Sequence, residues 1–361
     1  MDHKERLKRI ERELAVLNLD SLIVTHLPNI RYLCGFTGST GTLWVQHGSA
    51  VFFTDGRYTS QAREQVQGAR VVITRNSPLL GGGDWIAGKT GREKHVLGIE
   101  SEYMTVAAQH RLREILPKKV QIKQVSGVIE KHRVVKDADE MEATRKAVLA
   151  GAKLFKVLLE TVRPGARESE VAAELEYAAR KAGVEGMSFE TIIASGRRSA
   201  LPHGRASQDA IPANGFVVCD FGVILTGYCS DMTRTLYMGR ANGEARSFYE
   251  AVRQAQLAAI AAVAPGIPIG EVDRAARRVL KRAGLGQYFT HSTGHGVGLE
   301  IHEAPRVAAG QSDLLRPGMV ITIEPGAYVP DKWGVRIEDM VVVTDSGCEV
   351  LTPTSKELIA V

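Results

Sequence analysis

Hydrophobic and polar positions in the first 130 residues follow two alternating patterns. Short apolar runs, bounded by Asp or Gly, predict strands at residues 21–25, 42–46, 51–53, 71–74 and 96–99. Apolar positions three and four residues apart predict helices at residues 59–66 and 106–116. This alternation is typical of a small α/β domain.

One glycine run interrupts the pattern. Gly81-Gly82-Gly83 lacks the GxGxxG spacing of a dinucleotide-binding loop. We interpret this run as a flexible loop.

A polar stretch at residues 131–139 separates the first part of the chain from a long amphipathic helix, for which Asp137 or Asp139 is a suitable N-cap. With 361 residues, the chain exceeds the length at which a single core usually stops growing. We therefore expect two domains, residues 1–133 and residues 137–361.

The second domain contains an internal repeat. Residues 163–171 resemble residues 264–272, 101 residues later, and each copy reads as a turn followed by a helix. Farther along, Asp220 and Glu324 each end an apolar, strand-like run and precede a glycine-bearing turn. The repeat predicts a pseudo-twofold fold with a site where the two halves join.

Composition narrows the class of protein. The chain is 44% hydrophobic and 24% charged, as is usual for soluble globular proteins. Its net charge of +5 is small, and no long block of Lys and Arg occurs, which argues against nucleic-acid binding. No apolar segment is long enough to span a bilayer, no signal peptide is evident, and the four cysteines are scattered. We expect a cytoplasmic protein with reduced thiols that does not bind membranes.

Two aspartates in the second domain are placed as if to share a cation. Asp220 ends one strand-like run and Asp231 opens the next, with a turn between them. Any hairpin with an even loop puts both on one face of the sheet. A loop at Leu225-Thr226 would set them directly opposite each other, with Cβ atoms about 5 Å apart. Two bare carboxylates at this distance repel each other, whereas a cation between them would stabilise the pair.

Two glutamates lie in similar surroundings. Glu324 and Glu338 are each embedded in an apolar, strand-like run, where burial of a carboxylate is costly without a compensating charge. For Glu338 the alternative is an edge-strand acid that faces water. Asp339 falls on the opposite sheet face, so we expect it to be solvated or to support the site from behind.

The histidines of the second domain are concentrated near these acids. It has four, and three of them, His291, His295 and His302, lie in one glycine-flanked segment. The fourth, His203, precedes His302 by 99 residues, close to the offset of the repeat, so the two are expected to face each other across the site. Carboxylate oxygens with one imidazole suit Mn, Fe, Co or Zn and a bound water, which indicates metal-assisted hydrolysis.

Several segments resemble one family of proteins, the pita-bread metallopeptidases of the Xaa-Pro branch, which comprises aminopeptidase P and prolidase. The resemblance covers nearly the whole chain. It implies an α+β fold in which a pita-bread catalytic domain with a pseudo-twofold repeat follows a smaller α/β domain, and it implies a homodimer. The segments are Arg31-Tyr-Leu-Cys-Gly-Phe-Thr-Gly-Ser, His295-Gly-Val-Gly-Leu-Glu-Ile-His302-Glu, Ile323-Glu-Pro-Gly and Gly334-Val-Arg-Ile-Glu338-Asp.

The resemblance also implies a centre of two divalent metal ions. Asp231 and Glu338 would bridge the two ions. Asp220 would complete the coordination of one ion, and His295 with Glu324 that of the other. We expect Mn, with Co, Zn or Fe as alternatives.

Further side chains match functional positions of the family. His203 and His302 match histidines that contact the substrate, while His291 and Arg336 match positions associated with the proline-specific branch. We expect Glu324 to accept a proton from the attacking water, and His203 or His302 to donate to the oxyanion or the departing nitrogen. For Arg336 the alternative is a structural ion pair with a nearby acid.

The expected substrate is a peptide with proline at its second position. We expect an Xaa-Pro aminopeptidase, which accepts longer peptides, with an Xaa-Pro dipeptidase that cleaves only dipeptides as the alternative. A methionine aminopeptidase fits less well, because that group usually lacks the first domain. A metal-free, creatinase-like hydrolase and a non-catalytic binding module on the same scaffold are remote alternatives, since all five ligand positions are kept.

Overall fold

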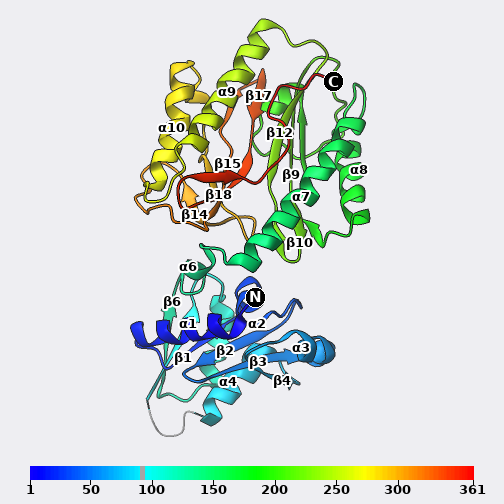
Figure 1. Cartoon of the computed structure of the whole chain (residues 1–361). Helices are drawn as coiled ribbons and strands as arrows, with labels where there is room; N and C mark the ends of the chain where they lie inside the picture. The colour runs from blue at the N-terminus through cyan, green and yellow to red at the C-terminus, as the bar shows by residue number, and fades with distance from the viewer. Residues whose placement is uncertain (90–93) are drawn as a thin grey trace. The chain divides into compact units, whose positions relative to one another are not determined.

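The computed structural model describes residues 1–89 and 94–361. It divides into two compact units, Met1–Arg133 and Val134–Val361 (Figure 1). In the described part of the chain, no helix is both long and apolar enough to cross a membrane.

The first unit is built on a mixed six-stranded sheet with the order β4-β3-β2-β1-β5-β6. All five predicted strands and both predicted helices of this unit occur, with ends within two residues of those expected. The strands are β1 (Ser21–Val24), β2 (Thr42–Gln46), β3 (Ser49–Asp55), β4 (Arg70–Thr74), β5 (His95–Glu100) and β6 (Val120–Val125). The helices are α1 (His3–Val16), α2 (Leu27–Cys34), α3 (Thr59–Gln65), α4 (Pro78–Lys89), α5 (Val106–Ile115) and α6 (Glu130–Arg133).

The run Gly81-Gly82-Gly83 lies inside helix α4, so the prediction of a flexible loop is wrong. The helix packs closely on its neighbours. A Cβ added to Gly83 would lie 2.3 Å from Cδ1 of Ile115, and one added to Gly82 would lie 3.5 Å from the ring of Phe53. Glycine has a low intrinsic helix propensity, but here the close packing that it permits outweighs that preference.

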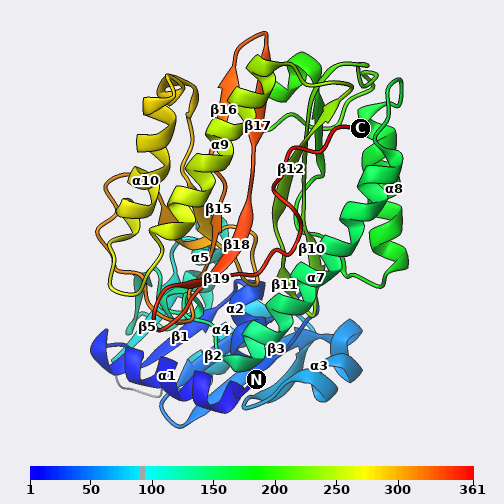
Figure 2. The ribbon, with the colours of Figure 1, turned by 45° about the horizontal axis from the view of Figure 1, so that its top comes forward.

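The second unit carries two helix pairs, with α7 and α8 on one side of the strands and α9 and α10 on the other (Figures 1 and 2). Asp137, one of the two residues predicted as N-cap, caps the first of these helices and forms a capping box with Glu140. The helices are α7 (Ala138–Thr161), α8 (Glu168–Lys181), α9 (Gly243–Ala261) and α10 (Ile269–Arg282).

Helices α8 and α10 are the two copies of the predicted repeat. Both have 14 residues, and they begin 101 residues apart. Each is followed by a glycine in the left-handed region, Gly183 at φ 84° and Gly284 at φ 75°. A left-handed residue after a helix is a common way to end it, so the sequence repeat corresponds to a repeated local structure.

Two antiparallel sheets lie between the helix pairs, a three-stranded sheet in the order β12-β9-β8 and a five-stranded sheet in the order β14-β13-β15-β18-β19. Strands β7, β10 and β11 form a third sheet, and β16 pairs with β17. The strands are β7 (Gly186–Met187), β8 (Ile192–Ser195), β9 (Gly215–Phe221), β10 (Val223–Leu225), β11 (Tyr228–Cys229), β12 (Met232–Met238), β13 (Gly294–Gly296), β14 (Glu303–Val307), β15 (Val320–Ile323), β16 (Gly326–Val329), β17 (Trp333–Arg336), β18 (Asp339–Val343) and β19 (Cys348–Val350).

Separate apolar clusters attach each helix pair to its strands. Leu158 of α7 and Leu175 of α8 pack in one cluster with Val217 of β9. Val252 of α9 packs in another with Ile321 of β15. Burying one such aliphatic side chain contributes about 1.5–3 kcal/mol. Each half therefore provides a rigid support for the strand ends that carry the acidic residues.

Candidate metal centre

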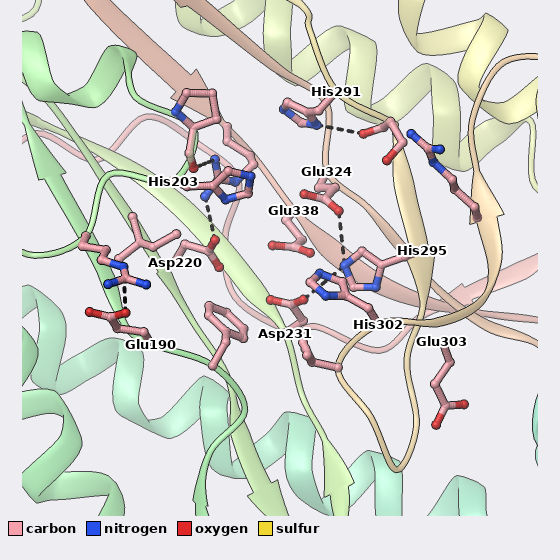
Figure 3. A pocket seen from close by; sticks show the side chains of 18 residues that line it. Glu190, His203, Asp220, Asp231, His291, His295, His302, Glu303, Glu324 and Glu338 are labelled. Carbon is pink, nitrogen blue, oxygen red and sulfur yellow. Dashed lines mark hydrogen bonds and ion pairs between the residues drawn. The ribbon is translucent and has the colours of Figure 1, made fainter. Parts of the chain in front are cut away.

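A cavity of about 680 Å³ opens in the second unit (Figure 3). This volume is within the usual range for sites that bind small molecules. All nine residues proposed from the sequence line it, namely His203, Asp220, Asp231, His291, His295, His302, Glu324, Arg336 and Glu338.

The first pair of acids comes from the hairpin that joins β9 to β12. Its turn is Thr226-Gly227, where both residues have positive φ, 51° and 82°. The loop is even, so Asp220 and Asp231 share a sheet face as expected. The direct pairing expected for a turn at Leu225-Thr226 is wrong, because Asp220 lies opposite Thr233. The two aspartates are diagonal neighbours, which leaves more room between them for a cation.

The second pair comes from β15 and β18. These strands pair antiparallel with Ile323 opposite Asp339. Continuing that register by one residue sets Glu324 opposite Glu338. Oε2 of Glu338 accepts a hydrogen bond from Oγ1 of Thr233 at 2.7 Å, so a residue of the first half orients an acid of the second.

His295 lies at the centre of the short strand β13, between β14 and β15. Its neighbours must be glycines, because the flanking backbones lie so close. A Cβ on Gly294 would come within 1.9 Å of the carbonyl oxygen of Thr322, and one on Gly296 within 2.2 Å of that of Ala304. The glycines flanking this histidine thus allow its backbone to fit between two strands.

The hydrogen bonding of His295 leaves one ring nitrogen available as a ligand. Nδ1 lies 3.0 Å from the carbonyl oxygen of Gly296, which only accepts, so Nδ1 carries the proton. Burial lowers the pKa of His295 to about 4, which keeps the ring neutral near pH 7. Nε2 then presents a lone pair, 3.6 Å from Oδ2 of Asp231 and 3.3 Å from Oε1 of Glu324. A hydrogen bond to a backbone carbonyl through the other nitrogen is typical of metal-binding histidines.

Three carboxylate oxygens at this site are buried and have no hydrogen-bond partner within residues 1–89 and 94–361. They belong to Asp220, Asp231 and Glu338. Single ligand atoms of Asp231, His295 and Glu338 all lie within 4.8 Å of one another. Buried carboxylates are normally paired or bound to metal. The residues therefore fit a site for divalent cations.

The electrostatics of the acids agree with this fit. Burial, followed by the neighbouring carboxylates Glu338 and Asp220, raises the pKa of Asp231 well above its usual range. Burial and the charges of Glu324 and Asp220 do the same for the pKa of Glu338. Burial raises the pKa of Glu324 to about 8. Bound cations would reverse these shifts, because they stabilise the ionised carboxylates.

Arg336 lies beside this cluster and is fully engaged with protein groups. Nη2 donates to Oδ2 of Asp220 at 2.6 Å, which is the ion pair considered as the alternative for this residue. Nη1 donates to the hydroxyl of Tyr328 at 2.8 Å and to the carbonyl of Pro202 at 2.9 Å. The guanidinium therefore connects an acid of the site to the loop that carries His203.

His291 lines the cavity, but both of its ring nitrogens are used within the protein. Nδ1 lies 2.8 Å from the carbonyl oxygen of Ser292, and Nε2 lies 3.0 Å from the hydroxyl of Tyr328. Because the carbonyl accepts, Nε2 is the acceptor of the tyrosine proton. Burial, then the charge of Arg336, lowers the pKa of His291 to about 4. Its place in this chain supports an indirect role, through Tyr328.

The other two histidines are differently placed. His203 and His302 are both exposed, and within the described part of the chain neither ring hydrogen-bonds to another residue. The ring of His302 stands edge-on to that of His295, with centroids 4.4 Å apart. Partial burial of the ring and the charge of His203 lower the pKa of His302. These two rings are thus the ones free to contact a ligand.

Asp339 is not solvated, contrary to one of the two expectations for it. It is fully buried and accepts hydrogen bonds from Arg234 at 2.7 Å and from Gln256 at 2.8 Å. Arg234 also donates to the backbone carbonyl of Glu338. Asp339 thus supports the site from behind the strand, which was the other expectation.

Two residues with clear roles in this geometry were not identified from the sequence. Thr233 contacts both Glu338 and Arg336, and its position two residues after Asp231, on the same strand face, was an available signal. Tyr328 bridges His291 and Arg336. It lies on β16, where the pairing with β17 brings it near Arg336, whereas His291 reaches it from the segment before β13, so no local pattern indicated it.

Comparison with known proteins agrees with this geometry. The profile of metallopeptidase family M24 matches residues 142–345, and that of the creatinase/prolidase N-terminal domain matches residues 6–135. This chain belongs to metallopeptidase family M24. Its fold is accordingly the pita-bread catalytic domain preceded by a creatinase-type domain, as expected, and the enzyme class is that of a metal-dependent peptidase.

Relatives of this M24 metallopeptidase match it over almost their full length. The Xaa-Pro dipeptidase of Pyrococcus furiosus is 36% identical, and the match covers 99% of this chain and 100% of the relative. The solved structure of the Xaa-Pro dipeptidase from Bacillus anthracis is 37% identical, with a TM-score of 0.94 and coverage of 100% of both chains. That of the X-Pro aminopeptidase from Thermotoga maritima is 31% identical, with a TM-score of 0.88 and coverage of 97% and 100%.

Proposed function

We propose that this protein is an Xaa-Pro exopeptidase with two divalent metal ions, of the prolidase type, which cleaves Xaa-Pro dipeptides. The names of the relatives place the dipeptidase ahead of the aminopeptidase, which reverses the order expected from the sequence. The aminopeptidase remains the second candidate, because a solved X-Pro aminopeptidase is also similar over nearly the whole chain.

One observation carries the metal-dependent part of the proposal. The lone pair of His295 faces two carboxylates, and three buried carboxylate oxygens nearby lack a hydrogen-bond partner in the described chain. Without cations, burying these carboxylates together is energetically unfavourable. Carboxylate oxygens and an imidazole nitrogen are suitable ligands for divalent cations. Asp220, Asp231, His295, Glu324 and Glu338 are the residues that would hold the two ions. We propose Mn, with Co, Zn or Fe as alternatives.

The chemistry assigned to the protein residues is proton transfer and orientation. When bound, two divalent ions supply Lewis acidity and make a water acidic near neutral pH. Glu324 would accept a proton from the water that attacks the carbonyl before proline. His302 and His203, whose rings make no hydrogen bond within residues 1–89 and 94–361, donate to the oxyanion or to the departing nitrogen. Arg336 keeps Asp220 in its orientation.

The cavity also offers a rationale for proline. Phe189, Ile192 and Ile301 contribute apolar wall around the charged cluster. A pyrrolidine ring fits such a wall. A tertiary amide has no N–H to donate, so a site that makes no use of this proton does not penalise proline.

The proposal is tested with metal-free protein to which Mn²⁺, Co²⁺, Zn²⁺ or Fe²⁺ is added separately. Release of alanine is measured from Ala-Pro, Ala-Pro-Ala and Ala-Ala. A prolidase cleaves only Ala-Pro efficiently, whereas comparable turnover of Ala-Pro-Ala identifies an aminopeptidase. Equal cleavage of Ala-Ala would refute the proline requirement. No hydrolysis of Ala-Pro or Ala-Pro-Ala by protein that holds stoichiometric metal would refute the proposed function.

A further inference from the structure

Two walls of the cavity are loops rather than strands, and each contains one of the pocket histidines. Residues 196–206 run between β8 and β9 and include His203, and residues 286–293 precede β13 and include His291. Each loop is tied by hydrogen bonds to a fully buried carboxylate on one of the two repeated helices. These carboxylates lie outside the predicted set of metal ligands.

Glu168, the first residue of α8, holds both ends of the first loop. Its Oε1 accepts hydrogen bonds from the backbone nitrogen and the hydroxyl of Ser195, at 2.7 and 2.8 Å. Its Oε2 accepts from Nε of Arg198 at 3.0 Å. The same oxygen accepts from the backbone nitrogen and the hydroxyl of Ser207, at 3.1 and 2.7 Å. Five donors therefore converge on one carboxylate, and the residues just before and just after the loop are joined through it.

The first loop is connected directly to the metal centre. The carbonyl of Pro202 accepts a hydrogen bond from Nη1 of Arg336 at 2.9 Å, and Arg336 pairs with Asp220. The next residue is His203, whose exposed ring makes no hydrogen bond within the described chain. Its position therefore depends on the backbone of the loop, which Glu168 fixes.

Asp273, on α10, ties the C-terminal end of the second loop, directly and through Arg277. Its Oδ1 accepts from the hydroxyl of Thr293 at 2.9 Å, and its Oδ2 accepts from Nε of Arg277 at 2.7 Å. Arg277 in turn donates to the backbone carbonyl of His291 at 2.5 Å. The carbonyl of Thr293 accepts from the backbone nitrogen of Glu324 at 2.8 Å. The network thus extends from the helix to the proposed proton acceptor.

Glu168 and Asp273 have analogous contacts, but they do not occupy equivalent positions of the repeat. With the offset of 101 residues, Glu168 corresponds to Ile269, one helical turn before Asp273. Residues four apart lie on the same helix face. Each half therefore directs a carboxylate from the inner face of its repeated helix to its own loop, using a different residue.

We propose that Glu168 and Asp273 are positioning residues that hold the two histidine-bearing walls of the cavity in place for the reaction. Burying a carboxylate is costly, and an apolar residue could fill the same space, so stability alone does not explain the choice. Charge-assisted hydrogen bonds to several backbone and side-chain donors specify a geometry that apolar packing would not. The kinetic part of this inference depends on the proposed function, whereas the structural part does not.

The test compares Glu168→Gln and Asp273→Asn with the wild type. Each change keeps the size of the side chain but places an amide N–H against donors. Matched controls are Glu174→Gln, an exposed acid on α8, and Glu271→Gln, on α10. Backbone bonds remain between helix and loop in the first variant, such as Ser169 N to Ser207 O at 2.9 Å, which favours correct folding. Ser207→Ala, which removes one donor, is the milder variant for the case that Glu168→Gln does not fold.

The first readout is amide hydrogen exchange, which requires no substrate. Exchange should rise within residues 196–206 in Glu168→Gln and within residues 286–293 in Asp273→Asn, each with the other loop unchanged. The second readout is the kinetics of Ala-Pro hydrolysis with Mn²⁺. In Glu168→Gln kcat should fall on the order of tenfold, with a smaller change in KM, because the loop holds His203, a proposed donor to the oxyanion or the departing nitrogen. In Asp273→Asn the larger change should also be in kcat, because Thr293 holds the backbone of Glu324.

A merely structural role predicts something different. Both variants would then show exchange raised throughout the unit and a lower melting temperature, with KM and kcat of the folded fraction equal to those of the wild type and the controls. That result would overturn the proposal. Absence of Xaa-Pro hydrolysis in the wild type would refute the proposed function, while the exchange data would still decide whether the carboxylates hold the loops.

Discussion

At the scale of single residues, the metal centre is a compromise between binding and stability. Asp231 and Glu338 are buried together, and each has a carboxylate oxygen without a hydrogen-bond partner in the described chain. Such groups oppose folding unless a cation is bound. Sites of this kind often become more stable when a functional charge is removed.

Replacing Asp231 by Asn should therefore have opposite effects on binding and stability. Hydrolysis and bound Mn²⁺ should be lost, since a proposed metal ligand is gone. The metal-free variant at pH 8 should be more stable than metal-free wild type by about 1 kcal/mol, because one buried charge has been removed. Elemental analysis and urea unfolding in the presence of a chelator measure the two effects. Full activity in a variant that contains no metal would contradict the assignment.

At the scale of elements, the site depends on a short strand in which only glycines can flank His295 and on a tight turn that requires positive φ angles. Strand β13 fits between its neighbours only because Gly294 and Gly296 lack side chains. The hairpin that presents the two aspartates turns at Thr226-Gly227, where Thr226 is β-branched and has φ 51°. β-branched residues rarely adopt this conformation.

Gly296→Ala should destabilise the protein and remove activity together. The added methyl group would meet the carbonyl of Ala304 at 2.2 Å, and the strand carrying His295 would have to move. We expect a loss of about 1–3 kcal/mol, as for other overpacked sites. Gly347→Ala is the control, since an added Cβ there has nothing within 4 Å. Thermal unfolding and Mn²⁺ binding are the measurements, and an unaltered metal affinity would argue against this role of the glycine.

Thr226→Asn should stabilise the hairpin. Asn tolerates positive φ better than Thr and is favoured before Gly in two-residue turns. The relief of strain should be about 1 kcal/mol in the free energy of unfolding. Gly227→Ala, at φ 82°, should shift unfolding in the opposite direction. Because the turn determines the register of the aspartates, a change of register would appear as reduced metal affinity, which we do not expect for Thr226→Asn.

At the scale of the whole molecule, the buried ionisable groups link stability to pH and to metal. Burial raises the pKa of Glu324 to about 8 and lowers the pKa of His291 and His295 to about 4. A carboxyl group with a raised pKa binds more protons in the folded state, so its contribution to stability falls as the pH rises toward the folded pKa. A histidine with a lowered pKa has the opposite effect, but only up to the unfolded value near 6.5.

Between pH 6.5 and about 8 only the carboxyl groups contribute to this linkage. Metal-free protein should therefore lose stability over this range, by about 1 kcal/mol or more. Saturating Mn²⁺ should remove this dependence, because bound cations hold the carboxylates ionised. Urea unfolding at half-unit pH steps, with chelator or with Mn²⁺, measures it. A metal-free protein whose stability rises from pH 6.5 to 8 would show that these acids are ionised without metal.

The sequence alone determined the parts of this protein that depend on local pattern. Periodicity located five of the six strands of the first unit and missed β6, Asp137 was recognisable as an N-cap, and the offset of 101 residues corresponds to two equal helices. The cavity-lining residues could be named because acids inside apolar runs, and histidines between glycines, are unusual enough to stand out.

Only the tertiary structure decided what depends on contacts between distant segments. In the β9–β12 hairpin, Thr233 rather than Asp231 lies opposite Asp220. The position of the turn at Thr226-Gly227 determines this register, and the apolar pattern of the strands does not specify it. The run Gly81-Gly82-Gly83 is helical because its close packing on neighbouring side chains outweighs the low helix propensity of glycine. Asp339 is buried and accepts a hydrogen bond from Arg234, a contact that the local pattern did not reveal. Periodicity records which face of an element is apolar, but not which distant residues meet on that face.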